Sequence, residues 1–215
     1  MNLKGVIFDL DGTLADTLPV CYAAFRSALA PYSDREYSDR EIHGFFGPTE
    51  EGIIRRLVPN DWEAGLQLYL EAYERAHDMC PTPFAGIETA LQLLREQGIA
   101  LGVVTGKGPA SAAISLKRLG LESYFDVVEA GAAEGPIKPA SIRQVLARWN
   151  LSPSQVAYVG DAPSDIDAAH QAGVVAIGAA WARPEQAAAL KARAPLAVFD
   201  RVDCFVAWIE ETTQS

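Results

Sequence analysis

The chain has 215 residues, of which 49% are hydrophobic and 21% are charged, so it can fold around a core as one domain or as one domain carrying an insertion. Its net charge of -10 and its lack of a basic run argue against nucleic acid or an anionic membrane surface as a partner. We find neither a secretory signal nor an apolar run approaching the roughly 18 residues that span a bilayer. The scattered cysteines Cys21, Cys80 and Cys204 form no C-x-x-C pair, and we expect a reducing, cytoplasmic location.

Short apolar runs alternate with helical patterns along most of the chain. The expected strands span residues 3–8, 100–105, 127–129, 156–160, 174–177 and 197–199. The expected helices between the later strands span residues 87–97, 109–119, 140–149, 164–172 and 184–192. Because most of the strands are apolar on both faces, the pattern predicts an α/β fold, a doubly wound parallel sheet with a Rossmann-like core.

One region, residues 16–81, breaks this alternation. It contains no expected strand, and four helical patterns follow one another over residues 18–29, 39–46, 49–57 and 62–76. The region leaves the sheet directly after the first strand and rejoins it at Pro81. We therefore predict an inserted α-helical cap over residues 16–81, above the carboxyl edge of a core formed by residues 1–15 and 82–215.

Side chains that could carry chemistry follow four of the expected strands. A buried acidic pair is costly unless a cation or a substrate uses it, and the carboxyl ends of parallel strands meet at the edge where ligands bind. Each cluster alone is a weak signal, since it could be a solvated turn, a surface lysine or a helix N-cap. The ordered set is more specific: Asp9 with Asp11, then Thr105-Gly106-Lys107, then Lys138 in a proline-flanked loop, and then Asp161 with Asp165.

This set contains the groups that phosphoryl transfer needs. Asp9 can be a nucleophile that forms an aspartyl-phosphate, and Asp11 can protonate the leaving alcohol and then activate water. Thr105 and the amide of Gly106 can hold phosphate oxygens, and Lys138 offers a positive charge between the nucleophile and the phosphate.

The acidic residues also suggest a metal. Oxygen ligands from Asp9, Asp161 and a backbone carbonyl suit Mg²⁺, and without a cation these carboxylates would repel an anionic phosphate. Asp165, four residues after Asp161, can orient the waters of the metal or ligate it directly.

The ordered set resembles the motifs of the haloacid dehalogenase-like hydrolase superfamily. The segment Asp9-Leu10-Asp11-Gly12-Thr13 looks like its first motif, Thr105 like its second, Lys138 like its third, and Gly160-Asp161 with Asp165 like its fourth. The insertion looks like the helical cap of the phosphoglycolate phosphatase-like subgroup. The chain departs from the pattern at Ala140, where a second proline is frequent.

The resemblance implies a magnesium-dependent phosphatase of small phosphorylated metabolites, whether phosphoglycolate-like, sugar phosphates or nucleotides. It implies that Asp9, Asp11 (by its carbonyl) and Asp161 ligate the metal. The sequence does not indicate the oligomeric state of the protein.

Other reactions of similar proteins fit less well. Asp11 argues against a dehalogenase, which lacks a carboxylate at that position, and the absence of lysine from residues 16–81 argues against a phosphonate hydrolase that forms a Schiff base. A sugar phosphomutase would use the same core residues and stays an alternative. A signalling receiver domain, which stores a phosphoryl group on Asp, is less favoured because its acceptor follows a later strand and it has no inserted cap.

Substrate choice is expected where the cap faces the core. The turn Gly47-Pro48, followed by Thr49 and Glu50, offers a loop that could reach the substrate, with Arg55 on the following helix. Phe45 and Phe46 precede this loop and either line the site or pack inside the cap.

Overall fold

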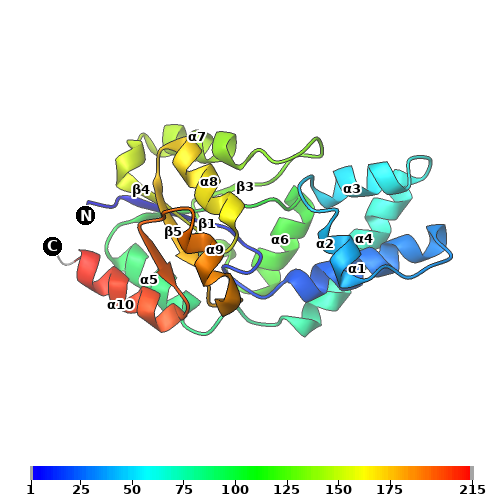
Figure 1. Ribbon diagram of the computed structural model, residues 1–215, viewed down its shortest axis with the longest axis horizontal. Coiled ribbons are helices and arrows are strands. Elements are labelled where there is room, and N and C mark those ends of the chain that lie inside the picture. Colours follow the sequence, from blue (N-terminus) through cyan, green and yellow to red (C-terminus); the bar gives the residue numbers. More distant parts are fainter. Residues whose placement is uncertain (1, 214–215) are drawn as a thin grey trace.

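The structure is a computed structural model that describes residues 2–213, and its centre is a six-stranded sheet. All neighbouring strands are parallel, and their order is β3-β2-β1-β4-β5-β6. Figure 1 shows helices on both faces of this sheet, so the predicted doubly wound α/β fold is confirmed. The strands are β1 Gly5–Phe8, β2 Ala100–Val104, β3 Val127–Glu129, β4 Val156–Gly160, β5 Val175–Ala179 and β6 Ala197–Phe199.

Strand β1 lies in the middle of the sheet because its side chains are apolar in both directions. Val6 and Phe8 enter one hydrophobic core and Ile7 enters the other, as expected for alternate residues of a strand that is covered on both faces. The first core is closed by α5 Ile87–Glu96, α6 Pro109–Arg118 and α10 Val202–Thr213, and the second by α7 Lys138–Trp149, α8 Pro163–Ala172 and α9 Ala187–Lys191.

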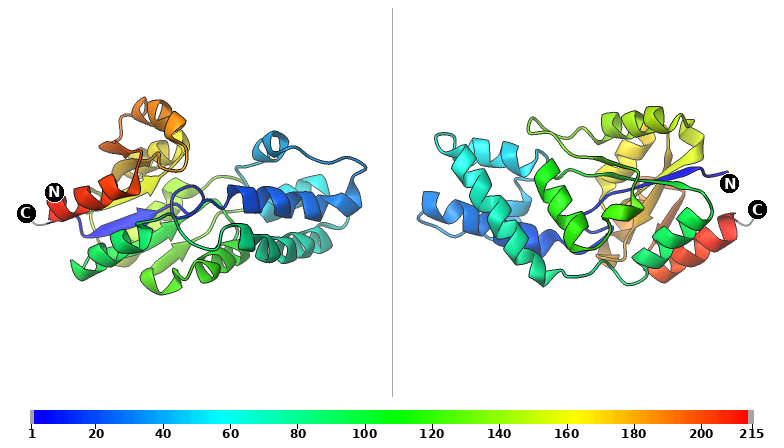
Figure 2. Two further views of the ribbon diagram at one scale, coloured as in Figure 1. Left: turned by 90° about the horizontal axis from the view of Figure 1, so that it is seen from below. Right: turned by 180° about the vertical axis from the view of Figure 1, so that it is seen from behind.

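The helices of the insertion pack against one another beyond the carboxyl edge of the sheet (Figures 1 and 2). Their core is aromatic, with the rings of Phe25 and Tyr69 4.6 Å apart between centroids and Tyr73 stacked on Tyr69. The inserted helical cap is thus present, while its boundaries at residues 16 and 81 stay a prediction. Its helices are α1 Leu18–Leu29, α2 Asp39–His43, α3 Glu50–Leu57 and α4 Trp62–Ala76.

Several elements differ from the sequence-based expectation. Helix α10 was not predicted, although Val202, Phe205 and Ile209 follow a helical spacing and are buried. Helix α2 ends at His43, three residues earlier than expected, and Gly47, with φ +143°, then turns the chain before Pro48. In the described part of the chain, no helix is both long and apolar enough to cross a membrane.

The unpredicted helix α10 supplies a central side chain of the first core. The ring of Phe205 lies within 6.2 Å of the rings of Phe8, Trp181 and Phe199, and only 1% of the residue is exposed. We expect Phe205→Ala to lower the free energy of unfolding by about 3–5 kcal/mol, since it leaves a cavity among these rings. Urea denaturation measures this loss. The adjacent, exposed Cys204→Ala is the control and should change the value by less than about 0.5 kcal/mol; equal effects of the two changes would contradict this description of the core.

Candidate active site

The candidate site lies where the strand order reverses. After β1 the chain builds β2 and β3 on one side, and then returns to place β4 on the other side of β1. Such a reversal opens a crevice at the carboxyl ends of the two central strands. Asp9 directly follows β1 and Asp161 directly follows β4, so the fold brings together two carboxylates that are far apart in the sequence. The amide of Asp9 continues the sheet pairing by donating to the carbonyl of Val159 at 2.9 Å.

Asp9 is buried and has one engaged oxygen and one free oxygen. Its Oδ2 lies 3.1 Å from Nζ of Lys138, whereas its Oδ1 is buried without any hydrogen-bond partner among the residues that the structure describes. Lys138 has a second partner, since its Nζ lies 2.6 Å from Oδ1 of the fully buried Asp165. Burial raises the pKa of Asp9 to about 8, even though Lys138 acts in the opposite direction. Lys138 is the first residue of α7 rather than part of the expected loop.

Asp161 is paired with Arg183, which was not among the predicted site residues. Its Oδ2 accepts a hydrogen bond from Nη2 of Arg183 at 2.5 Å, and Nε of Arg183 is buried without a partner. Burial, reinforced by the neighbouring Asp165, raises the pKa of Asp161 to about 6, although Arg183 lowers it. A sequence signal existed, because Arg183 follows the end of β5 as the other site residues follow theirs.

Asp9, Asp161 and Asp165 form a group that fits a divalent cation. One oxygen from each carboxylate lies within 4.8 Å of the others, and only two cationic side chains, Lys138 and Arg183, face these three charges among the described contacts. The unpartnered Oδ1 of Asp9 is a ligand atom that no protein group uses. Hard oxygen donors of this kind suit Mg²⁺.

The turn after β1 requires glycine at position 12. Gly12 has a φ of +74°, and a Cβ built there would lie 2.3 Å from Oδ2 of Asp161. Any side chain would therefore displace the carboxylate of Asp161 from its present position. This requirement explains why the acidic pair is followed by glycine.

Asp11 is tied to the cap and to a buried lysine. Its Oδ1 accepts hydrogen bonds from the hydroxyl of Thr17 and from Nζ of Lys107, the latter at 3.2 Å. Lys107 extends from the loop after β2 into the cap, where its Nζ lies 3.0 Å from Sγ of Cys21 and 4.4 Å from the centre of the Tyr73 ring. Burial is the largest single influence on the pKa of Lys107 and lowers it, but Asp11, Cys21 and the neighbouring tyrosines together raise it more, so the net shift is upward. Lys107 belongs to the predicted Thr105-Gly106-Lys107 cluster, but its pairing with Asp11 was not predicted.

Thr105 and Gly106 line the same cavity as Asp9 and Asp161. Thr105 is buried and continues the sheet, with its amide donating to the carbonyl of Glu129 at 3.1 Å. Its hydroxyl oxygen accepts a hydrogen bond from the amide of Lys107 at 3.2 Å. A Cβ built at Gly106 would meet no protein atom within 4 Å, so this backbone faces open space.

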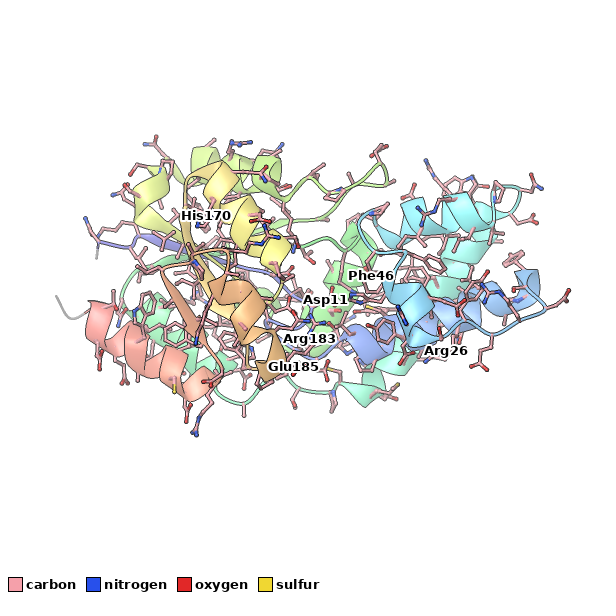
Figure 3. The ribbon with its side chains drawn as sticks, viewed as in Figure 1. Asp11, Arg26, Phe46, His170, Arg183 and Glu185 are labelled. Atoms are coloured by element: carbon pink, nitrogen blue, oxygen red, sulfur yellow. The ribbon has the colours of Figure 1, made fainter. Side chains whose placement is uncertain are left out.

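A cavity of about 660 Å³ connects these groups with the cap. Six of the seven predicted site residues line this cavity: Asp9, Asp11, Thr105, Gly106, Lys138 and Asp161. The seventh, Asp165, does not line it but contacts Lys138, which does. Figure 3 shows Phe46 of the cap facing the region of Asp11 and Arg183 of the core. Glu50 also lines the cavity, as expected, but Arg55 does not: it pairs with Glu51 and lies over the ring of Trp62.

The raised pKa of Asp9 leads to a prediction for the protein freed of metal by a chelator. The folded state holds a proton on Asp9 up to about pH 8, whereas the unfolded chain loses it near pH 4, so stability falls as the pH rises through this window. Asp9→Asn removes the buried charge, while Lys138 keeps Asp165 as its partner. We expect the variant to be more stable than the wild type at pH 8, by about 1 kcal/mol or more, and equally stable near pH 4.

Thermal or urea unfolding at the two pH values measures this difference. The exposed Asp34→Asn is the matched control and should follow the wild type at both values. A wild-type protein that is more stable than Asp9→Asn at pH 8 without metal would show that the carboxylate of Asp9 is not under electrostatic strain.

Comparisons with known proteins give the family. The chain matches the haloacid dehalogenase-like hydrolase family over residues 6–179. It is 31% identical over 195 residues to a pyrophosphatase of Bacillus pumilus, covering 89% of this chain and 90% of the relative. It is 30% identical over 188 residues to a phosphoglycolate phosphatase of Neisseria meningitidis, covering 82% and 80%. Its fold is similar to that of a haloacid dehalogenase-like family hydrolase from Streptococcus pneumoniae, with a TM-score of 0.78, 25% identity, and 96% and 98% of the two chains covered. Because the match covers most of the chain, from β1 through the cap to the end of β5, the chain belongs to the haloacid dehalogenase-like hydrolase family.

Proposed function

We propose that this enzyme is a phosphatase that hydrolyses small phosphorylated metabolites through a phosphoryl group carried on Asp9. The observation that carries the proposal is the state of this carboxylate. One oxygen is fixed by Lys138 and the other is unpartnered, in a residue that lines a cavity large enough for a small ester. The names of the two relatives, which describe one as acting on pyrophosphate and the other on phosphoglycolate, support a small phosphorylated substrate.

In the first step, an oxygen of Asp9 attacks phosphorus and the bond from phosphorus to the leaving oxygen breaks, which gives an aspartyl-phosphate. Lys138 contacts this carboxylate and also lines the cavity, so it neutralises charge on the phosphate oxygens. The hydroxyl of Thr105 and the amide of Gly106 supply further hydrogen bonds to the same oxygens. These donors are held by the end of β2 and need little rearrangement.

Asp11 is the proposed general acid and base. Its carboxyl group gives a proton to the leaving oxygen in the first step. In the second step it takes a proton from the water that attacks the phosphorus of the aspartyl-phosphate, which regenerates Asp9 and releases phosphate. The contacts of Asp11 with Thr17 and Lys107 hold this side chain at the junction of core and cap, where a leaving group would emerge.

Asp9, Asp161 and the main-chain carbonyl of Asp11 are the proposed ligands of Mg²⁺. When bound, the cation would neutralise charge on the phosphate and on the three clustered carboxylates. Asp165 is proposed to act behind these ligands, since it is fully buried and holds both Lys138 and the amide of Ala162.

A phosphate-release assay over a panel of phosphorylated metabolites tests the proposal. We expect release with Mg²⁺, loss of release in excess chelator, and recovery when Mg²⁺ is restored, because the carboxylates alone would repel the substrate. A folded Asp9→Asn protein should show no turnover. Formation of an isomer of a sugar phosphate without free phosphate would instead identify a phosphomutase, and activity of Asp9→Asn equal to the wild type would refute the role of Asp9.

The role of Asp11 predicts a dependence on the leaving group. Asp11→Asn should lower kcat/KM for alkyl phosphates, which reports the first step alone, by roughly 10²–10⁴-fold, the usual contribution of a general acid. The loss should be smaller for an aryl phosphate, whose leaving group departs without a proton. Steady-state kinetics with both ester types measures the two losses, and equal losses would speak against proton donation by Asp11.

A further inference from the structure

The cap side of the cavity is apolar and aromatic. Leu18, Phe25, Phe46, Ile53 and Tyr69 line it, and among the described cap residues that line it there is no lysine or arginine. His43 is the one basic ring of this wall, and its Nδ1 is hydrogen-bonded to the hydroxyl of Tyr22 at 3.1 Å. A leaving group that reaches this wall would therefore meet hydrocarbon and aromatic surface.

The one acidic side chain of this wall, Glu50, occupies the place where a second anion could bind. Its Oε2 accepts a hydrogen bond from the amide of Gly108 at 2.9 Å, and its Oε1 accepts one from the hydroxyl of Ser111. These donors belong to the N-terminus of α6, which would otherwise attract a negatively charged group. A Cβ at position 108 would lie 2.7 Å from Oε1 of Glu50, so the fit is close. Glu50 thus fills this anion-binding position and adds a negative charge beside it.

The three long cationic side chains of the cavity come from the core and are already engaged. Lys138 is shared by Asp9 and Asp165, Lys107 is buried against Asp11, and Arg183 is bound to Asp161. A second anionic group on the substrate would have to compete with these carboxylates. An unpaired anion placed against the apolar wall would lose its hydration without compensation.

Resting on the proposed function, we propose that the preferred substrates are phosphate monoesters whose leaving group is uncharged and carries an apolar or aromatic ring. Benzyl phosphate is the simplest example, and nucleoside 5′-monophosphates have the same chemistry. The ring would lie against Phe46 and its neighbours, where burial of its apolar surface favours binding. Compounds with a second anionic group, such as the ester phosphoglycolate or the anhydride pyrophosphate, are then poor substrates, in contrast to the substrates named for the two relatives.

The test compares benzyl phosphate with phosphoglycolate. Both are esters of a primary alcohol, so they differ mainly in whether a phenyl ring or a carboxylate is attached beside the ester. We expect kcat/KM for benzyl phosphate to exceed that for phosphoglycolate by about tenfold or more, because ring burial favours the first and an unpaired charge disfavours the second. A ratio below one would overturn the proposal.

Two neighbouring phenylalanines provide a matched pair of variants. Phe46 lines the cavity and stacks on Tyr22, whereas Phe45 packs edge-on against Tyr37 and does not line it. Phe46→Ala should lower the ratio of the two kcat/KM values severalfold, while Phe45→Ala should leave the ratio unchanged. If both variants leave the ratio unchanged, the aromatic wall does not select the substrate and the proposal fails.

A binding measurement separates this proposal from the proposed function. If no compound of the metabolite panel and neither of these esters releases phosphate, the phosphatase assignment fails. Calorimetric titration of the Asp9→Asn variant with each ester then still tests whether the apolar cap wall favours binding of the ring, because binding needs no turnover. Tighter binding of benzyl phosphate supports the apolar subsite, and tighter binding of phosphoglycolate overturns it.

Discussion

The structure depends on one buried ionic cluster, in which Lys138 is held between Asp9 and Asp165. Taking three charged groups out of water is expensive, and one lysine does not neutralise two carboxylates. A hydrophobic cluster of the same size would be at least as stable. The fold nevertheless places these residues at the end of β1 and in the first turns of α7 and α8, around the point where strand order reverses. The arrangement is understandable if a bound cation supplies the positive charge that the protein alone lacks for these carboxylates and for an anionic substrate.

The cap is attached to the core at the border of this cluster rather than at a distance from it. The amide of Thr49 donates to the carbonyl of Ala132 at 3.0 Å, and Glu50 binds the start of α6. Lys107 reaches from the core to Cys21 of the cap and pairs with Asp11 at the junction of the two parts. The surroundings of the proposed general acid are therefore shared between the two parts, so a change in the cap would alter both substrate fit and proton transfer.

Much of this arrangement could be predicted from the sequence, because it follows from local patterns. Apolar runs gave the six strands, and the positions of Asp9, Thr105, Lys138 and Asp161 after four of them led to the prediction of a common site. The early end of α2 was not predictable from apolar spacing alone, since it depends on the turn at Gly47. Helix α10 was missed although its spacing was readable.

The partners of the charged residues could not be predicted in the same way. Lys107 and Asp11 are 96 positions apart, and Arg183 and Asp161 are 22 apart, and no periodicity links either pair. Their pairing depends on side-chain packing in three dimensions. The apolar cap wall could not be predicted from the sequence either. Phe25, Phe46 and Tyr69 come from three segments that meet only in the folded cap.

The central claim is that Asp9 carries the phosphoryl group, and trapping that group tests it most directly. The Asp11→Asn variant with an aryl phosphate and Mg²⁺ should accumulate the aspartyl-phosphate, since it lacks the base that activates water. Rapid acid quench, borohydride reduction and peptide mass spectrometry would then convert and locate the modified residue. The account predicts homoserine in place of Asp9, formed only when the substrate and Mg²⁺ are both present. Homoserine at another aspartate, or continued phosphate release with no trapped residue, would contradict it.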